Sequence, residues 1–287
     1  MCERAGADTR IALQNEFEIR HDQILSRASR SRTVPGQKGM NTIQKVAVAG
    51  ATGSLGRGVM AEVRARGIAS VALSRAMGVD LTTGAGLDEA LTGVTSVIDA
   101  SSQNTTNAKA STCFFTAATR NLLAAEDRAG VPHHVAISII GAAEIDAAYY
   151  AGKAAQERII TARQSGWSIL RTTQFHEFVH QIIAAGHAGP LQLVPKMRTQ
   201  PVSIPEVAEA LVDIALGDPV GFAPDLAGPR EERMADLVTR YLSAAGIRRR
   251  VIEFPMPGRF GRGMRDGSIL PKPGTRLGAQ TFAQWLA

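Results

Sequence analysis

The sequence predicts an α/β fold in which a doubly wound parallel sheet is followed by a small C-terminal lobe. From about residue 43 onward, short apolar segments typical of buried parallel strands alternate with segments of helical periodicity. Three glycines, Gly50, Gly53 and Gly56, separate the first strand from the first helix. The chain has 287 residues, of which 45% are hydrophobic, enough for one large domain with its own core.

Residues 1–42 lie outside this alternation, and we expect them to form a flexible N-terminal extension. The segment 30–39 combines Arg, Ser, Pro and Gly residues and is typical of a linker. Met40 stands just before the first strand, so we also expect translation of the native protein to begin there. The domain would then comprise residues 43–287, with a C-terminal lobe formed mainly by residues 174–287.

The first predicted strand covers residues 46–49, and the first helix runs from about 55 to 66. Gly50 permits a tight turn off the strand, because a side chain there would clash. Gly53 lets the backbone approach a bound pyrophosphate, and Gly56 lets the helix pack against the strand. A surface turn rich in glycine is the alternative, but the flanking strand and helix favour a phosphate-binding turn.

Three further residues of this turn are candidates for contact with a dinucleotide. Thr52 and Ser54 offer hydroxyl groups, and Ser54 is also the expected N-cap of the helix. Leu55 opens the apolar face of the helix. The free N–H groups and the dipole of a helix N-terminus favour phosphate.

The second strand is predicted at residues 69–74 and a short third strand at 78–82. Ser74 and Arg75 follow the second strand with no acid, and an arginine there accommodates the 2′-phosphate of NADP. The sequence therefore favours NADP(H) over NAD(H), unless Arg75 is an ordinary surface arginine. Asp80 can accept a hydrogen bond from the adenine amino group or from a nearby backbone N–H.

A fourth strand is predicted at residues 94–100, followed by a polar loop. Ala100 and Ser101 stand where this strand meets the loop, and ligands of open α/β sheets bind at such carboxyl ends. A helix at 111–129 and a fifth strand at 133–140 follow. His133 and His134 are adjacent on that strand and point to opposite faces, so we expect no metal site there.

Ser138, Tyr149 and Lys153 form the candidate catalytic set. Tyr149 and Lys153 are four residues apart at the start of a predicted helix and therefore share one face. The pKa of a free phenol is about 10, and a nearby ammonium lowers it. Tyr149 could then exchange a proton with a carbonyl oxygen, Lys153 could hold the nicotinamide ribose, and Ser138 could orient the substrate. A Tyr-x-x-x-Lys pair also arises by chance on helices.

With these residues in view, the sequence resembles the NmrA-like, NAD(P)H-binding branch of the atypical short-chain dehydrogenases/reductases. The resemblance spans about residues 43–287. It rests on Gly50-Ala-Thr-Gly-Ser-Leu-Gly56, on Tyr149-Tyr-Ala-Gly-Lys153 with Gln156-Glu157, and on Trp167-Ser-Ile-Leu-Arg-Thr-Thr-Gln-Phe-His-Glu-Phe178. It implies a Rossmann-like fold, a bound NAD(P) and oxidoreductase activity. Thr172-Thr173 departs from relatives that have a proline after the arginine.

The function expected from the residues and the resemblance is NAD(P)H-dependent oxidoreduction of a small carbonyl or quinone-like substrate. Two alternatives remain open: a non-catalytic redox sensor that binds NAD(P) without turning it over, as some NmrA-like proteins do, and an NAD-dependent sugar epimerase-like enzyme.

The C-terminal part is expected to form the substrate lobe. A sixth strand is predicted at 167–171, and Phe175 and His176 after it are substrate candidates, although His176 fits equally well as a packing residue. Helices near 205–216 and 231–245, short strands at 221–228 and 251–254, and an irregular segment at 255–278 follow.

Composition limits the partners. The net charge is +6, with a basic surplus after residue 246. No nucleic-acid-binding motif accompanies these arginines, so we expect a solvated surface and no nucleic-acid partner. No apolar run approaches a membrane span. Cys2 and Cys113 fit no metal or redox spacing, which favours the cytoplasm. The expected partner is a small-molecule substrate, and the protein is expected to be a monomer or homodimer.

Overall fold

The computed structural model describes residues 44–287, and these residues form one compact unit. The predicted extension, the translation start at Met40 and Cys2 lie outside the described residues.

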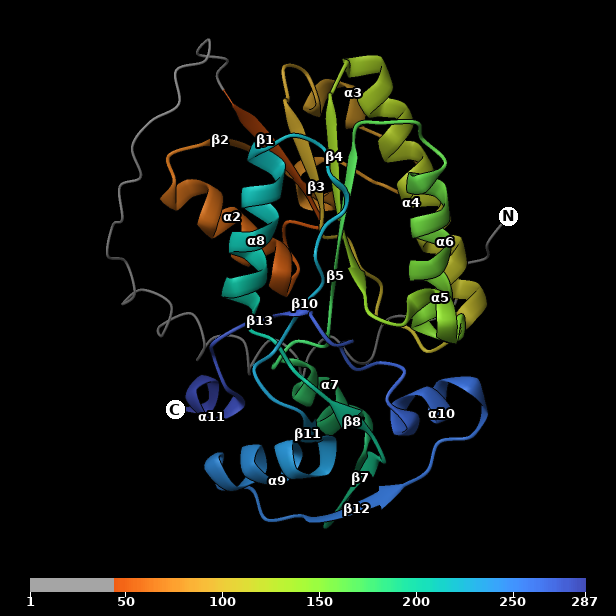
Figure 1. Cartoon of the computed structure of the whole chain (residues 1–287), viewed down its shortest axis with the longest axis vertical. Helices are drawn as coiled ribbons and strands as arrows, with labels where there is room; N and C mark the ends of the chain where they lie inside the picture. The colour runs from red at the N-terminus through yellow and green to blue at the C-terminus, as the bar shows by residue number, and fades with distance from the viewer. Residues whose placement is uncertain (1–43) are drawn as a thin grey trace. The chain divides into compact units, whose positions relative to one another are not determined.

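The central sheet confirms the predicted doubly wound, Rossmann-like architecture (Figure 1). Its strand order is β13-β10-β5-β4-β3-β1-β2, with β9 also paired to β5, and every pairing is parallel. The strands are β1 Lys45–Ala49, β2 Ala69–Leu73, β3 Ser96–Asp99, β4 His133–Ile139, β5 Trp167–Thr172, β9 Gly221–Phe222, β10 Leu226–Ala227 and β13 Arg276–Leu277.

The chain reverses its direction of travel across the sheet at β1. From β1 it moves to β2 on one side, and β3 then pairs with the other side of β1. Ala49 at the end of β1 is in register with both Leu73 and Asp99. Ligands of doubly wound sheets bind in the crevice beyond the strand ends at such a switch point.

Helices cover both faces of the sheet (Figure 1). On one face α2 and α8 pack together, and on the other face α4 packs along α6. These elements are α2 Ser54–Ala65, α3 Leu87–Ala90, α4 Ala108–Ala129, α5 Ala142–Ile145, α6 Tyr149–Thr161 and α8 Ile204–Leu216. Successive residues of β1 point to opposite faces, so Val46 and Val48 enter one core while Ala47 and Ala49 enter the other.

The C-terminal lobe has its own apolar core, which includes Val179, Val194, Leu237 and Phe282. Two small sheets, β12-β7-β6 and β11-β8, lie among its helices. Its elements are α7 Phe178–Ala185, β6 His187–Ala188, β7 Leu191–Pro195, β8 Arg198–Thr199, β11 Glu232–Arg233, α9 Met234–Ala244, β12 Arg250–Phe254, α10 Gly258–Asp266 and α11 Phe282–Leu286.

Three sequence-based predictions of elements are wrong. The third strand predicted at 78–82 is replaced by the 3-10 helix η2 Arg75–Met77, turns and a single bridge between Asp80 and Ala85. Gly78, Gly84 and Gly86 have φ values of 79°, 82° and 75°, a left-handed conformation that favours turns over a strand. The segment 255–278 contains α10, and the strand predicted at 221–228 is divided into β9 and β10.

None of the helices found between residues 44 and 287 has both the length and the apolar character needed to cross a membrane.

Candidate active site

The glycine turn joins β1 to α2 at the switch point of the sheet. Gly50 has φ of 73°, and its N–H donates to the carbonyl of Leu73 (3.2 Å). A Cβ at Gly50 would lie 2.8 Å from the carbonyl oxygen of Ala100, and one at Gly56 would lie 2.1 Å from that of Gly50. Gly50 and Gly56 are therefore required by the close packing of β1, α2 and the end of β3.

The middle of this turn faces solvent. Thr52, Gly53 and Ser54 are exposed, whereas Leu55 is buried. The expectation that Ser54 caps α2 is wrong, because Gly53 is the N-cap and Ser54 is the first helical residue. A Cβ at Gly53 would meet only the carbonyl oxygen of Gly50, at 3.3 Å. The backbone at Gly53 is thus accessible, and its contact with a phosphate stays a prediction.

The residues predicted to contact the adenosine half lie after β2. Ser74 is the N-cap of η2, and the exposed Arg75 is its first residue. One carboxylate oxygen of Asp80 accepts hydrogen bonds from the hydroxyl (2.7 Å) and the backbone N–H (2.8 Å) of Thr82. These bonds lower the pKa of Asp80. Of the two hydrogen-bonding roles considered for Asp80, the structure shows the one with a backbone N–H.

Ala100 and Ser101 are buried at the end of β3, facing the glycine turn. The N–H of Ser101 donates to Asp99 (2.9 Å). The hydroxyls of Ser101 and Ser138 are buried without a hydrogen-bond partner among the described residues. Buried polar atoms are normally paired, so these two hydroxyls, at the carboxyl ends of β3 and β4, are exceptions.

Tyr149 is the first residue of α6, and its hydroxyl lies 3.2 Å from the hydroxyl of Ser102, on the loop after β3. Its ring packs edge-on against Phe115 of α4. Gly152 permits this close approach, since a Cβ there would lie 2.1 Å from the hydroxyl oxygen of Ser111. Burial raises the pKa of Tyr149 to about 12, although the hydrogen bond with Ser102 opposes the increase. The phenol therefore stays protonated at neutral pH and is a weaker acid than a free phenol.

Lys153 is buried and points into the domain. Its ammonium donates to the backbone carbonyl of Ile137 on β4 and to the side chain of Gln156, both at 2.9 Å. It also lies 4.4 Å from the centre of the Phe115 ring. Burial lowers the pKa of Lys153 to about 8, and the carboxylates of Asp99 and Glu157 oppose this decrease.

The predicted effect of Lys153 on Tyr149 is therefore not seen. The two residues share α6, but the pKa of Tyr149 is raised and Lys153 is not among the causes. The reason is that the ammonium is held by β4 and Gln156 instead of by the phenol.

The sequence analysis assigned no role in the site to Ser102, Asp99 or Gln156. Gln156 donates to Asp99 (2.8 Å) and so connects Lys153 to the end of β3. The only sequence signal was the position of Gln156 one helical turn after Lys153, because its contact with Asp99 joins residues 57 positions apart.

Phe175 and His176 lie on the loop after β5. Phe175 forms an isolated bridge with Val202. His176 is buried, lies 3.1 Å from the carbonyl oxygen of Gln280 and packs near the rings of Phe282 and Trp285. Burial lowers the pKa of His176. This geometry favours a packing role for His176 within the C-terminal lobe.

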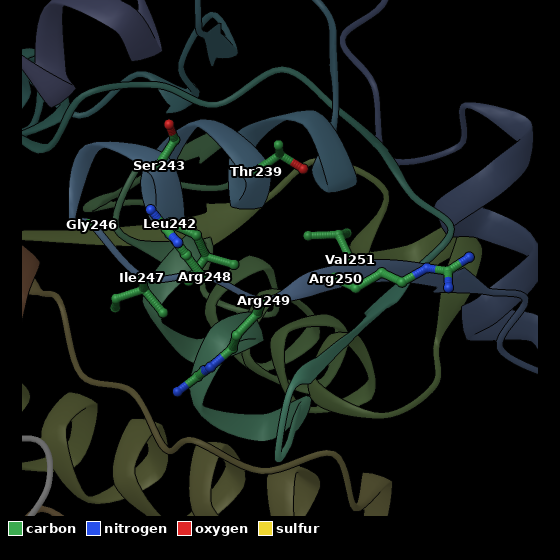
Figure 2. A pocket seen from close by; sticks show the side chains of 9 residues that line it. All are labelled: Thr239, Leu242, Ser243, Gly246, Ile247, Arg248, Arg249, Arg250 and Val251. Carbon is green, nitrogen blue, oxygen red and sulfur yellow. The ribbon is translucent and has the colours of Figure 1, made fainter.

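The basic segment after residue 246 lines a shallow surface groove of about 670 Å³ between α9 and β12 (Figure 2). Arg249 donates to Gln192 (3.0 Å), and the side chains of Arg249 and Arg250 point away from each other. Because the guanidinium groups diverge, they do not form one anion site. No residue of the glycine turn or of α6 lines this groove.

His133 lies 2.8 Å from the hydroxyl of Ser168, and His134 lies 2.7 Å from a carboxylate oxygen of Glu126. Over residues 44–287, no group of three or more His, Cys, Asp and Glu side chains is arranged to hold a metal ion.

Solved structures share this fold. UDP-N-acetylglucosamine 4-epimerase from Bacillus cereus superposes with a TM-score of 0.62 at 18% identity, covering 85% of this chain and 95% of its own. An NAD-bound short-chain dehydrogenase/reductase superfamily protein from Agrobacterium tumefaciens gives 0.61 at 17% identity, with coverages of 85% and 95%. UDP-glucose 4-epimerase from Thermus thermophilus, in complex with NAD, gives 0.60 at 20% identity, with coverages of 76% and 88%.

The chain has the fold of the short-chain dehydrogenases/reductases. At these identities, the comparison shows the fold alone. No family model matches the sequence, and no curated protein matches it.

Proposed function

We propose that this chain is an NAD(P)H-dependent oxidoreductase of the NmrA-like type, which reduces a small carbonyl or quinone-like substrate. The observation that carries the proposal is that the glycine turn and the hydroxyl of Tyr149 lie at the same edge of the sheet. The glycine turn lies at the switch point of the sheet, and the hydroxyls of Ser102 and Tyr149 meet on the loop that follows the neighbouring strand β3. The glycine turn, as the candidate phosphate site, and Tyr149, as the candidate proton donor, therefore share one edge of the sheet.

The residues present fit a dinucleotide. The turn at Gly53 would face the pyrophosphate, and Arg75 with Ser74 would accommodate a 2′-phosphate. Ala100 and the unpartnered hydroxyl of Ser101 would line the site beside the glycine turn. When bound, the reduced nicotinamide supplies the hydride.

The chain's own residues would manage the proton. Tyr149 is protonated at neutral pH because its pKa is about 12, so it can donate a proton to the oxygen of a carbonyl as that oxygen gains charge. The exposed hydroxyl of Ser102 could then relay a proton from solvent to the Tyr149 phenolate through their hydrogen bond, giving up its own proton as it takes one from water. The unpartnered hydroxyl of Ser138 would hold the substrate oxygen.

The first test is binding of NADPH, NADP, NADH and NAD by calorimetry, followed by a screen of carbonyl and quinone substrates. Tyr149→Phe should abolish turnover and leave dinucleotide affinity unchanged. Tyr150→Phe is the matched control, because the Tyr150 hydroxyl accepts a hydrogen bond from Gln174 (2.8 Å) within the core. Absence of binding for all four dinucleotides would refute the proposal.

A redox sensor is the second candidate, and the position of Lys153 favours it. Its ammonium is held by Ile137 and Gln156, which leaves Tyr149 without the cation that would make it a base. Tight, redox-selective binding with no turnover in the parent protein would support the sensor. Conversion of nucleotide sugars in the same screen would support the epimerase alternative.

A further inference from the structure

A continuous series of buried hydrogen bonds crosses the domain beneath the candidate site. The ammonium of Lys153 donates to Ile137 and Gln156, Gln156 donates to Asp99, and Asp99 accepts from the N–H of Ser101. Each distance is 2.8 or 2.9 Å. The side chains of Asp99, Gln156 and Lys153 are 0%, 1% and 2% exposed. The series therefore links α6 and β4 to the residue that faces the glycine turn.

The polarity of this series determines which residue can stand at its centre. Lys153 needs an acceptor, and the carboxylate of Asp99 needs a donor. A glutamine amide provides its oxygen to the first and its NH₂ group to the second. A carboxylate at position 156 would face Asp99 with like charge, and an apolar side chain would leave both partners short of a hydrogen bond.

We propose that Gln156 is a positioning residue that fixes the ammonium of Lys153 beside β4 and couples it, through Asp99, to the dinucleotide loop at Ser101. Binding at the glycine turn and the placement of Lys153 would then depend on each other. The role in binding rests on the function proposed above, whereas the placement of Lys153 can be tested without any ligand.

The charged groups that act on Lys153 come from two elements. Asp99 of β3 and Glu157 of α6 favour the ammonium form. The helix α4 presents the ring of Phe115, and β4 presents the carbonyl of Ile137. Gln156 alone connects the ammonium to Asp99 by hydrogen bonds in the described part of the chain.

The direct test is NMR titration of the Lys153 ammonium in protein with labelled lysine. In the parent the pKa should be about 8. Gln156→Met keeps the length of the side chain but removes the acceptor, so the proton affinity of Lys153 should fall about tenfold. An unchanged titration in folded Gln156→Met protein would overturn the proposal.

A charge-preserving exchange gives a second test if Gln156→Met does not fold. Gln156→Glu alone should lower stability, because two carboxylates would meet. Combining it with Asp99→Asn restores every bond. The carboxylate at position 156 accepts from the ammonium of Lys153 and from the NH₂ group of the amide at position 99. The oxygen of that amide accepts from the N–H of Ser101. The double variant should regain stability and raise the pKa of Lys153. Failure to recover stability relative to Gln156→Glu would contradict the proposal.

Gln192→Met is the matched control. Gln192 is fully buried in β7, where it donates to the carbonyl of Ile183 (3.2 Å) and accepts from Arg249. This variant should lose stability without altering the Lys153 titration or NADPH affinity, whereas Gln156→Met should weaken NADPH binding about tenfold. If the parent binds no dinucleotide, the proposed function fails, and the Lys153 titration still decides the role of Gln156.

Discussion

At the scale of single residues, Gly53 and Gly56 belong to one turn, but we expect Gly56 to matter for stability and Gly53 for dinucleotide binding. Gly56 lies against the carbonyl of Gly50, so Gly56→Ala would force the turn open. We expect the free energy of unfolding to fall by about 1–3 kcal/mol, as in other overpacked sites.

Gly53→Ala should have the opposite profile. Gly53 has φ of −73°, which alanine also adopts, and its new methyl would meet only one oxygen. Stability should change by less than about 1 kcal/mol, while dinucleotide affinity should fall about tenfold through loss of a phosphate contact. Urea unfolding and calorimetry on both variants measure the two effects. Equal losses of stability would contradict this division.

His134 should make stability depend on pH. Burial opposes its charged form, but the carboxylate of Glu126 and their hydrogen bond outweigh burial, so the pKa of His134 is raised. Because the folded pKa exceeds the unfolded value of about 6.5, the stabilisation is complete below that pH and is lost as pH rises through the folded pKa. The parent should therefore have a larger free energy of unfolding than His134→Gln at low pH, and this difference should shrink as the pH rises from neutral to alkaline.

His133 provides an internal comparison of opposite sign. Burial lowers the pKa of His133, so its neutral form is favoured in the folded state and stability is lost as pH falls below about 6.5. Urea unfolding of the parent, His133→Gln and His134→Gln from pH 5.5 to 9 measures how each histidine changes the free energy of unfolding with pH. A constant difference between His134→Gln and the parent across this range would contradict the assignment.

At the scale of elements, Glu206 of α8 holds the segment that leads into α11. One of its carboxylate oxygens accepts from the N–H groups of Ala279 (2.5 Å) and Gln280 (3.3 Å). Glu206→Ala should speed hydrogen exchange across residues 278–287, because this segment would lose both bonds. Glu209→Ala, an exposed position on the same helix, is the control. Equal exchange in the two variants would show that other contacts hold the segment.

The order of elements could be predicted because the periodicities of strands and helices are local properties. β1, α2, α4, β4 and α6 lie within a few residues of their predicted positions. The error at residues 78–82 arose because the apolar pair Val79 and Leu81 imitates a strand, whereas the surrounding glycines determine the backbone. The direction of Lys153 could not be predicted, since it depends on Ile137 and on the contact of Gln156 with Asp99, residues distant in sequence.

At the scale of the whole molecule, a bound dinucleotide should raise the melting temperature. A ligand at a hundred times its dissociation constant stabilises the folded state by about 2.7 kcal/mol, equivalent to roughly 5–10 °C for a domain of this size. If Arg75 binds the 2′-phosphate, NADPH should stabilise more than NADH at equal concentration. Arg75→Ala should remove that difference and leave the NADH effect intact. Equal stabilisation of the parent by both would refute the preference for NADPH.

The strand order also has a consequence for the nascent chain. β5 is covered on its outer side by β9 and β10, which emerge from the ribosome about 50 residues later. At synthesis rates of roughly 5–20 residues per second, the five earlier strands of the central sheet would wait about 2.5–10 s with the backbone of β5 exposed. An uncovered strand edge pairs readily with other chains. We therefore expect the edge of β5 to need protection from other chains during synthesis.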